Sequence, residues 1–273
     1  MAQDLRGKWV LVTGAASGIG RETCLLLAGE GSNLVLVDID DGGLLSLAGD
    51  LEALGAEVLH KVTDITDSEQ VEALAGEVRD RIGAVDVLLN NAGIGYSAEL
   101  KDTTEEQWRR LVDINFLGAV RMVNAFLPEM ISKGRGQIIN VSTGQVFYPV
   151  PTWGAYAASK AALATYSECL TWELRRFGIK VTTIFPGLIS TPFYSEVEAH
   201  NPAQKLVLWW IQRFGASPEG MAAKIVSGMR RGKRRVIHSW INWLTYLGRR
   251  AAPHAYDLVG DTFARALSKK PEA

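Results

Sequence analysis

WVLVTGAASGIG, residues 9–20, is the stretch of sequence that decides the fold. Its first residues are apolar or β-branched, which predicts a buried strand, and residues 18–30 carry apolar side chains at roughly helical spacing. The glycines between them allow a tight turn and a close approach of an anion to the main chain. A helix that begins at Gly18 points its free N–H groups at that anion. Strand, glycine loop and helix in this order predict a dinucleotide-binding unit, with a plain tight turn as the alternative.

Short apolar runs and longer amphipathic stretches alternate along the rest of the chain. We expect further strands at 33–38, 57–64, 85–93, 136–143, 179–187 and, as a short one, 234–238. We expect helices at 41–54, 68–82, 155–177 and in two segments within 104–133, where Thr103 or Thr104 precedes Glu106 and Gln107 as a capping signal. Strands of nearly continuous Val, Ile and Leu indicate a parallel sheet that is covered on both faces. The prediction is an α/β fold, a Rossmann-type doubly wound parallel sheet of about seven strands.

Composition supports a well-buried core. Of 273 residues, 47% are hydrophobic and 22% are charged, and the net charge of −1 gives no general attraction to nucleic acid. We expect a single domain over residues 1–273, in which 192–273 form a substrate lid and a C-terminal extension. Cys24 and Cys169 lack a CxxC spacing, so we expect two buried, reduced thiols. With neither a signal segment nor an apolar run of 18 residues in view, we expect a cytoplasmic protein.

Asp38 ends the second predicted strand, 18 residues after Gly20. A carboxylate at this place can accept hydrogen bonds from both hydroxyls of an adenine ribose, and it would repel a 2′-phosphate. Residues 15–17 contain no basic side chain that could bind such a phosphate. We therefore favour NAD over NADP. The alternative is that Asp38 caps a helix, because Asp40 and Asp41 follow it.

Several further motifs follow in a fixed order, and with the glycine loop they resemble the short-chain dehydrogenase/reductase family over nearly the first 195 residues. TGAASGIG (13–20) looks like its TGxxxGxG, NNAG (90–93) like its NNAG, and YAASK (156–160) like its YxxxK. Asp64-Ile65 looks like its adenine contact, and PGLIST (186–191) like its loop over the nicotinamide. The resemblance implies cofactor contacts from Gly14, Ser17, Gly18, Ile19, Gly20, Asp38, Asp64, Ile65, Asn91, Ala92, Gly93, Tyr156, Lys160, Pro186, Gly187, Ile189 and Thr191.

Tyr156 and Lys160 are four residues apart on a predicted helix, so they share one face. A phenol has a pKa near 10, and we expect the lysine ammonium and an oxidised nicotinamide to lower it by ~2–3 units. The phenolate could then remove the proton of a substrate alcohol while hydride leaves for the nicotinamide. The resemblance implies that Lys160 also holds the nicotinamide ribose and that Asn115 supports a proton-relaying water. The alternative is an incidental Tyr/Lys pair on an amphipathic helix.

The resemblance also implies a hydroxyl that hydrogen-bonds the substrate oxygen beside Tyr156. The family spacing of thirteen residues leads back to Thr143, whereas Ser142 lies fourteen residues back. Adjacent residues at a strand end point in opposite directions, so we expect one of the two to face the site. We favour Thr143; one extra residue within 144–155 would restore Ser142.

The segment that should close the substrate pocket is strongly apolar. Residues 192–214 contain Phe193, Tyr194, Leu206, Val207, Leu208, Trp209, Trp210, Ile211 and Phe214, and the loop before Tyr156 contains Val146, Phe147, Tyr148, Val150 and Trp153. No cluster of basic residues is placed there to bind a carboxylate or phosphate. We expect a pocket for a lipophilic alcohol or ketone that is steroid-, retinoid- or long-chain-like. Alternatively, these side chains form the core or the interface of a homodimer or homotetramer.

Residues 229–250 mix a basic cluster with Trp240, Trp243, Tyr246 and Leu247. Such a mixture suits peripheral contact with a membrane surface, although a C-terminal helix packed on its own domain or a partner subunit is the favoured alternative. His60, His200, His238 and His254 lack ligand spacing, so we predict no metal site.

Three functions remain open at this point. The leading one is an NAD-dependent secondary-alcohol dehydrogenase, and the second is an NADPH-dependent carbonyl reductase in which Asp38 is only a cap. The third is a nucleotide-sensing protein without turnover, but such a protein has no need of a paired phenol and ammonium. An epimerase usually has a TGxxGxxG loop, which residues 13–20 do not fit.

Overall fold

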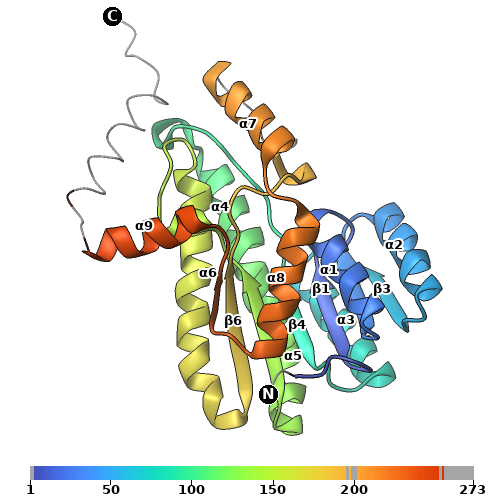
Figure 1. Cartoon of the computed structure of the whole chain (residues 1–273). Coiled ribbons are helices and arrows are strands. Elements are labelled where there is room, and N and C mark those ends of the chain that lie inside the picture. The colour runs from blue at the N-terminus through green and yellow to red at the C-terminus, as the bar shows by residue number, and fades with distance from the viewer. Residues whose placement is uncertain (1–2, 195–196, 198–201, 252–253, 255–273) are drawn as a thin grey trace, which may run out of the picture.

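The computed structural model describes residues 3–194, 197, 202–251 and 254, and its centre is a seven-stranded parallel sheet (Figure 1). The strand order is β3-β2-β1-β4-β5-β6-β7. The strands are β1 Trp9–Thr13, β2 Asn33–Asp38, β3 Val58–Val62, β4 Val87–Asn90, β5 Gly136–Val141, β6 Ile179–Phe185 and β7 Arg235–Ile237. The predicted Rossmann-type sheet is confirmed.

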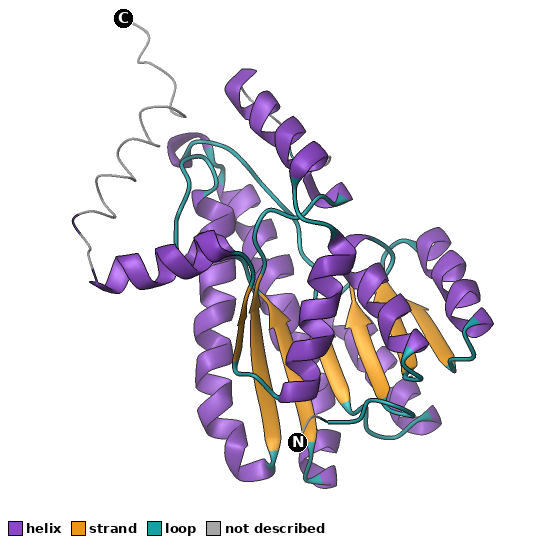
Figure 2. Cartoon of the chain, in the orientation of Figure 1, coloured by secondary structure: helices purple, strands orange, loops and turns teal. Residues whose placement is uncertain are grey.

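Helices cover both faces of this sheet (Figure 2). They are α1 Gly18–Gly29, α2 Asp41–Ala53, α3 Ser68–Arg81, α4 Glu105–Val112, α5 Gly118–Lys133, α6 Gly154–Glu173, α7 Pro202–Phe214, α8 Pro218–Arg231 and α9 Trp240–Ala251. Helix α4 begins with the capping box that was expected, in which Thr104 accepts a hydrogen bond from the N–H of Gln107.

Strand β1 shows how the side chains divide between the two faces. Val10 and Val12 point into a core that α1, α2 and α8 cover, whereas Leu11 points into the core beneath α3, α5 and α6. This alternation follows from the two-residue period of a strand. Both halves of the core are apolar, which explains the runs of Val and Leu within β1, β2 and β4.

The stretch Glu105–Lys133 is long and apolar enough, by length and composition alone, to cross a membrane. Its apolar side chains Met122, Val123, Phe126 and Met130 instead pack in the second core, under the sheet. We therefore interpret it as a core helix. It contains one turn of π-helix, Asp113–Leu117, that separates α4 from α5.

The structure corrects one expectation and adds two helices. Cys24 is buried as predicted, but Cys169 on α6 is exposed. Helices α7 and α8 were not predicted, although α8 carries ordinary signals: Ser217 caps it by accepting from the N–H of Gly220, and Gly232 ends it in a left-handed conformation.

Candidate active site

The glycine loop after β1 is built for close backbone contact. Gly14 has a φ of +65°, and a Cβ there would lie 2.9 Å from the Cα of Ala92. A Cβ on Gly20 would lie 2.0 Å from the carbonyl oxygen of Gly14. Helix α1 begins next to the loop, and the side chain of its N-cap residue, Ser17, forms no capping hydrogen bond. Its first amides can therefore donate to a bound pyrophosphate.

The loop after β4 is tied to this glycine loop. The side-chain amide of Asn91 donates to the carbonyl oxygens of Thr13 (3.1 Å) and Gly14 (3.0 Å). The hydroxyl of Thr13 in turn accepts from the N–H groups of Asn91 and Ala92, both at 3.1 Å. Asn91 and Ala92 thus hold the glycine loop in shape.

Thr191 brings the predicted nicotinamide loop to the same place, because its Cβ lies 3.3 Å from the position of a Cβ on Gly18. The loop is fastened further along by a short bridge between Ile189 and Ala216. At its beginning, the N–H of Gly144 donates to the carbonyl of Pro186 at 2.8 Å.

Asp38 turns its carboxylate toward the glycine loop. Its Oδ2 accepts from the N–H of Ala16 at 3.0 Å, and its Oδ1 accepts from the N–H of Ile39 at 2.8 Å. The cap of α2 is Asp40, whose Oδ1 accepts from the N–H of Gly43 at 3.1 Å. The alternative that Asp38 caps this helix is therefore wrong.

Asp64 and Ile65 both make contacts within the chain that shape the turn after β3 and its packing. Oδ1 of Asp64 accepts from the N–H and the hydroxyl of Thr66, both at 2.8 Å, and so shapes the turn after β3. Ile65 is buried against Gly118, where a Cβ would lie 2.6 Å from its Cδ1. The predicted contact of this pair with an adenine stays a prediction.

Asn115 lies within the π-helical turn and is almost fully buried. Its Oδ1 accepts from the N–H of Ile94 at 2.9 Å, and its Nδ2 donates to the carbonyl of Ile94 at 3.0 Å and to the hydroxyl of Ser159 at 3.1 Å. A Cβ on Gly93 would lie 2.7 Å from Oδ1 of Asn115 and 2.8 Å from Nζ of Lys160. Three residues from distant parts of the sequence therefore meet here, as the motifs predicted.

Tyr156 and Lys160 lie on one face of α6, and both are buried. Burial raises the pKa of the Tyr156 phenol to about 12, although a hydrogen bond with Thr143 partly opposes the shift. Burial lowers the pKa of the Lys160 ammonium to about 8, and its Nζ donates to the carbonyl of Val141 at 3.0 Å. The sequence predicted a lowered phenol pKa. The chain's own groups raise it, because desolvation outweighs the hydrogen bond with Thr143. The predicted lowering also included an oxidised nicotinamide, and with that group bound it stays a prediction.

The two candidate hydroxyls of the β5 end have different partners. The hydroxyl of Ser142 donates to the main-chain carbonyl of Lys160 at 2.8 Å. Thr143 is the residue that hydrogen-bonds the phenol of Tyr156. The geometry thus places the hydroxyl of Thr143, which the spacing favoured, beside the phenol of Tyr156.

Apolar and aromatic side chains surround Tyr156. The ring of Trp153 lies 5.6 Å from the tyrosine ring, and the ring of Phe193 lies at the same distance. Helix α7 adds Leu208 and Ile211 to this cluster. Trp209 and Trp210, which were expected to line the lid, instead point to solvent.

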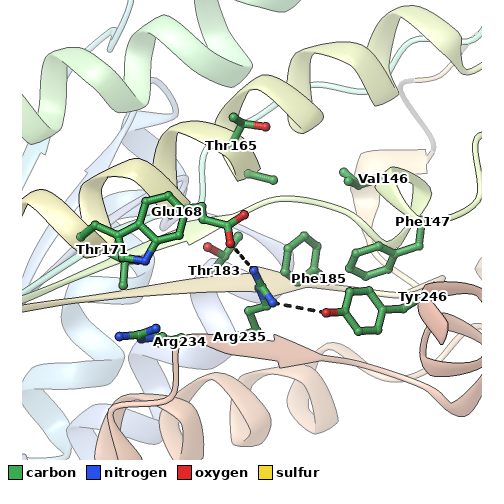
Figure 3. A pocket seen from close by; sticks show the side chains of 12 residues that line it. Val146, Phe147, Thr165, Glu168, Thr171, Thr183, Phe185, Arg234, Arg235 and Tyr246 are labelled. Carbon is green, nitrogen blue, oxygen red and sulfur yellow. Dashed lines mark hydrogen bonds and ion pairs between the residues drawn. The ribbon is translucent and has the colours of Figure 1, made fainter. Parts of the chain in front are cut away.

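The aromatic side chains of the loop before α6 face two different sites. Trp153 faces the site, but Phe147 packs on Phe185 and Tyr246 at ring distances of 4.7 and 5.1 Å. These three rings lie at a separate cavity of about 230 Å³ between α6, β6, β7 and α9 (Figure 3).

Sequence reasoning missed Asn242, a buried residue of α9. Its Nδ2 donates to the carbonyls of Phe185 and Pro186, both at 3.3 Å, directly before the nicotinamide loop. Its side chain also touches Gly144, since a Cβ there would lie 2.4 Å from Nδ2. A lone asparagine among Trp, Ile and Leu was the available signal.

Within the described ranges, no group of three or more His, Cys, Asp or Glu side chains could hold a metal ion. His200, one of the four histidines considered, lies outside the described residues.

Comparison with known proteins agrees with this geometry. Residues 8–202 match the family model described as short chain dehydrogenase. The probable oxidoreductase EphD of Mycobacterium tuberculosis is 36% identical over 92% of this chain, which spans only 42% of that relative's length. The 3-oxoacyl-acyl-carrier-protein reductase FabG of Thermotoga maritima is 36% identical over 81% of this chain and 90% of its own length.

A solved structure extends the likeness to three dimensions. A short-chain dehydrogenase/reductase from Burkholderia phymatum, in complex with NAD, superposes with a TM-score of 0.80 at 25% identity and covers 99% of both chains. The glycine loop, the buried Tyr156 and Lys160 and these matches lead to one conclusion: the chain belongs to the short-chain dehydrogenase family of oxidoreductases, which use a nicotinamide cofactor.

Proposed function

We propose that this protein transfers hydride between NAD and a lipophilic secondary alcohol or its ketone, with Tyr156 as the general acid and base. One observation carries the proposal. The phenol of Tyr156 is hydrogen-bonded to Thr143, lies one helical turn from Lys160 and is enclosed by apolar side chains. A protein that only sensed nucleotides would not need this arrangement.

Four parts of the site have the chemistry to hold a nicotinamide dinucleotide. The open N-terminus of α1 suits the pyrophosphate, and the carboxylate of Asp38 suits the hydroxyls of the adenine ribose. Lys160 suits the nicotinamide ribose, and the loop 186–191 suits the nicotinamide. When bound, the nicotinamide supplies or accepts the hydride at the substrate carbon.

Asp38 supports a preference for NAD. Its carboxylate is held beside Ala16, where the 2′-phosphate of NADP would bring a second negative charge. The NAD complex of the Burkholderia relative points in the same direction. In the rival reading, an NADPH-dependent carbonyl reductase, this carboxylate would have to be only a cap, and Asp40 already fills that place.

The chain's own residues then transfer the proton to or from the substrate oxygen. At neutral pH the phenol of Tyr156, with a pKa of about 12, is protonated and can donate to the oxygen of a ketone. The hydroxyl of Thr143 can donate to the same oxygen. The ammonium of Lys160, with a pKa of about 8, is also mostly protonated and stabilises the phenolate that remains. The reverse steps apply to alcohol oxidation.

The walls of the site favour a lipophilic substrate. Trp153, Tyr194, Leu208 and Ile211 pack around Tyr156 in one hydrophobic cluster. The relative FabG carries the name of a reductase for 3-oxoacyl chains, which are lipophilic ketones. We therefore expect an apolar body beside a single reacting oxygen.

The test is an assay of apolar alcohols and ketones with NAD(H) and NADP(H), read at the nicotinamide absorbance. We expect turnover with NAD(H), and Tyr156→Phe should lower it by ~10²–10⁴ while NAD binding survives. Tyr166→Phe, on the same helix and in contact with Phe116, is the matched control and should keep its activity. A Tyr156→Phe enzyme within threefold of the unaltered enzyme would refute the assignment.

A further inference from the structure

Helix α9 packs with its polar side inward. Asn242 is 1% exposed and Tyr246, one turn later, also faces the domain. The large apolar side chains point to solvent: Trp240 (71% exposed), Ile241, Trp243, Leu244 and Leu247. A surface helix of a globular protein normally does the reverse.

Polar contacts fix this inverted orientation. The amide of Asn242 donates to the carbonyls of Phe185 and Pro186, both at 3.3 Å. The hydroxyl of Tyr246 accepts from Arg235 at 3.3 Å, and its ring packs edge-on against Phe147 (Figure 3). The helix could bury its apolar side only by breaking these contacts, so the exposed face is part of the fold.

Helix α7 also exposes large apolar side chains, although its inward side is apolar too. Among Lys205–Phe214, whose side chains are described, Leu208 and Ile211 are buried. The exposed ones include Leu206 (64%), Val207, Trp209, Trp210 and Phe214. Together α7 and α9 hold ten of the eighteen exposed large hydrophobic side chains of the described residues. Figure 1 shows both helices standing off the sheet layers, at the end of the molecule where the strands finish.

The same part of the chain is strongly basic. Residues 202–251 contain ten Lys and Arg residues but only one acidic residue, Glu219, whereas the rest of the chain has 29 acidic and 19 basic residues. The overall net charge of −1 conceals this division. Four of these positive charges, Lys205, Arg213, Arg249 and Arg250, belong to α7 and α9, and neither helix contains an acidic residue. Arg230 on α8 and Arg235 on β7 instead pair with Glu30 and Glu168.

We propose that the outward faces of α7 and α9 form a membrane-binding surface for a leaflet that contains anionic lipid. Exposed Trp and Leu side chains insert at the level of the headgroups, and the Lys and Arg residues of α7 and α9 themselves attract anionic lipid. A second copy of the chain fits this surface less well. A two-fold contact through these helices would bring the basic residues of α7 and α9 from both copies together without an acidic partner, and like charges repel.

The surface also adjoins the reaction site. Leu208 and Ile211, on the inner side of α7, belong to the cluster around Tyr156. A substrate dissolved in the lipid would therefore reach the site past the edge of α7. This inference goes beyond the proposed function and does not depend on it, because lipid binding can be measured without turnover.

The experiment is co-sedimentation of the full chain with phosphatidylglycerol-containing vesicles and with pure phosphatidylcholine vesicles. We expect binding to the anionic vesicles at low ionic strength and a loss of it as salt is raised. The double variant Trp240→Ser/Leu244→Ser should lower the partition coefficient roughly tenfold or more. Trp172→Ser/Leu45→Ser removes the same residue types at exposed positions on α6 and α2, and this control should bind as the unaltered chain does.

Light scattering in the absence of lipid completes the test. A chain that stays in the supernatant with anionic vesicles at low salt would overturn the proposal. So would a dimer that Trp240→Ser/Leu244→Ser converts to monomers without any vesicle binding, because a second copy would then cover the face. Equal binding by the double variant and its control would overturn it too. Matching thermal transitions of the two variants would show that both remain folded.

Discussion

The hydroxyl of Ser142 donates a hydrogen bond to the main-chain carbonyl of Lys160 across 2.8 Å. This bond joins the end of β5 to the helix that carries Tyr156. Because the serine proton is donated to the main chain, it is not available to a substrate oxygen. Thr143, the next residue, is in extended conformation with a φ of −151° and points the other way, where it hydrogen-bonds Tyr156. The two adjacent hydroxyls therefore have separate tasks, and substitutions can tell them apart.

Thr143→Val should lower kcat/KM by roughly 10²-fold or more, since it removes a donor to the reacting oxygen without much change of volume. Thr143→Ser should restore most of the activity. Ser142→Ala should instead lower the free energy of unfolding by about 1 kcal/mol and leave turnover less affected. Steady-state kinetics and urea unfolding of the three variants check this, and the reverse ranking would make Ser142 the substrate-oxygen donor.

Asp38→Asn should narrow the preference for NAD(H) over NADP(H). The asparagine keeps an oxygen that can accept from Ala16, but it removes the charge that opposes a 2′-phosphate. Titration with both cofactors gives the ratio of dissociation constants. Asp40→Ala is the control: loss of the α2 cap should cost about 1 kcal/mol of stability and leave that ratio unchanged. Tighter binding of NADPH than of NADH by the unaltered protein would rule out this role of Asp38.

Gly93→Ala should damage activity, because its Cβ would lie 2.7 Å from Oδ1 of Asn115 and 2.8 Å from Nζ of Lys160. The added methyl group must displace one of these polar atoms from the site. Gly49→Ala, inside α2 with nothing within 4 Å of a Cβ, should raise stability by about 0.5–1 kcal/mol and spare turnover. A Gly93→Ala enzyme with unchanged kcat would show that the cluster can move aside.

Lys160 should make stability depend on pH in a defined window. Burial lowers its pKa from 10.5 to about 8, so between these values the unfolded chain binds a proton that the folded chain has released. Stability from this group therefore rises with pH across the window. The unfolding free energy of the unaltered chain minus that of Lys160→Met should therefore rise by about 1–3 kcal/mol from pH 8 to pH 10.

Urea unfolding of both proteins at several pH values measures that difference. Tyr156 acts in the opposite sense only above pH 10, since its pKa is raised from 10.0 to about 12. A difference that stays constant from pH 8 to 10 would contradict a desolvated Lys160.

The apolar wall of the site should appear in a chain-length series of ketones. Each methylene buried against Leu208 and Ile211 adds ~0.8 kcal/mol, so kcat/KM should rise several-fold per carbon until the pocket is full. Leu208→Ala should flatten the series, whereas Leu206→Ala, at an exposed position of the same helix, should not. The series is measured without vesicles, and a flat profile for the unaltered enzyme would contradict the lipophilic substrate.

Much of the fold followed from local patterns. The β1 strand, the glycine loop and the start of α1 are signalled by neighbouring residues, and the same holds for the cap at Thr104. The 13 residues of α7 were not predicted to be helical, because their apolar side chains were interpreted as part of a substrate lid.

The sequence by itself determined the parallel sheet, the family and the motif residues from Gly14 to Lys160, because strand periodicity, glycine turns and i,i+4 spacing act over a few residues. Only the tertiary structure decided which hydroxyl meets Tyr156, that Asp40 rather than Asp38 caps α2, and that Asn242 lies beneath the nicotinamide loop. It also decided that burial raises the phenol pKa and that α9 turns its tryptophans outward. These outcomes depend on contacts between segments far apart in the chain and on the desolvation that packing imposes, and neither can be read from local sequence.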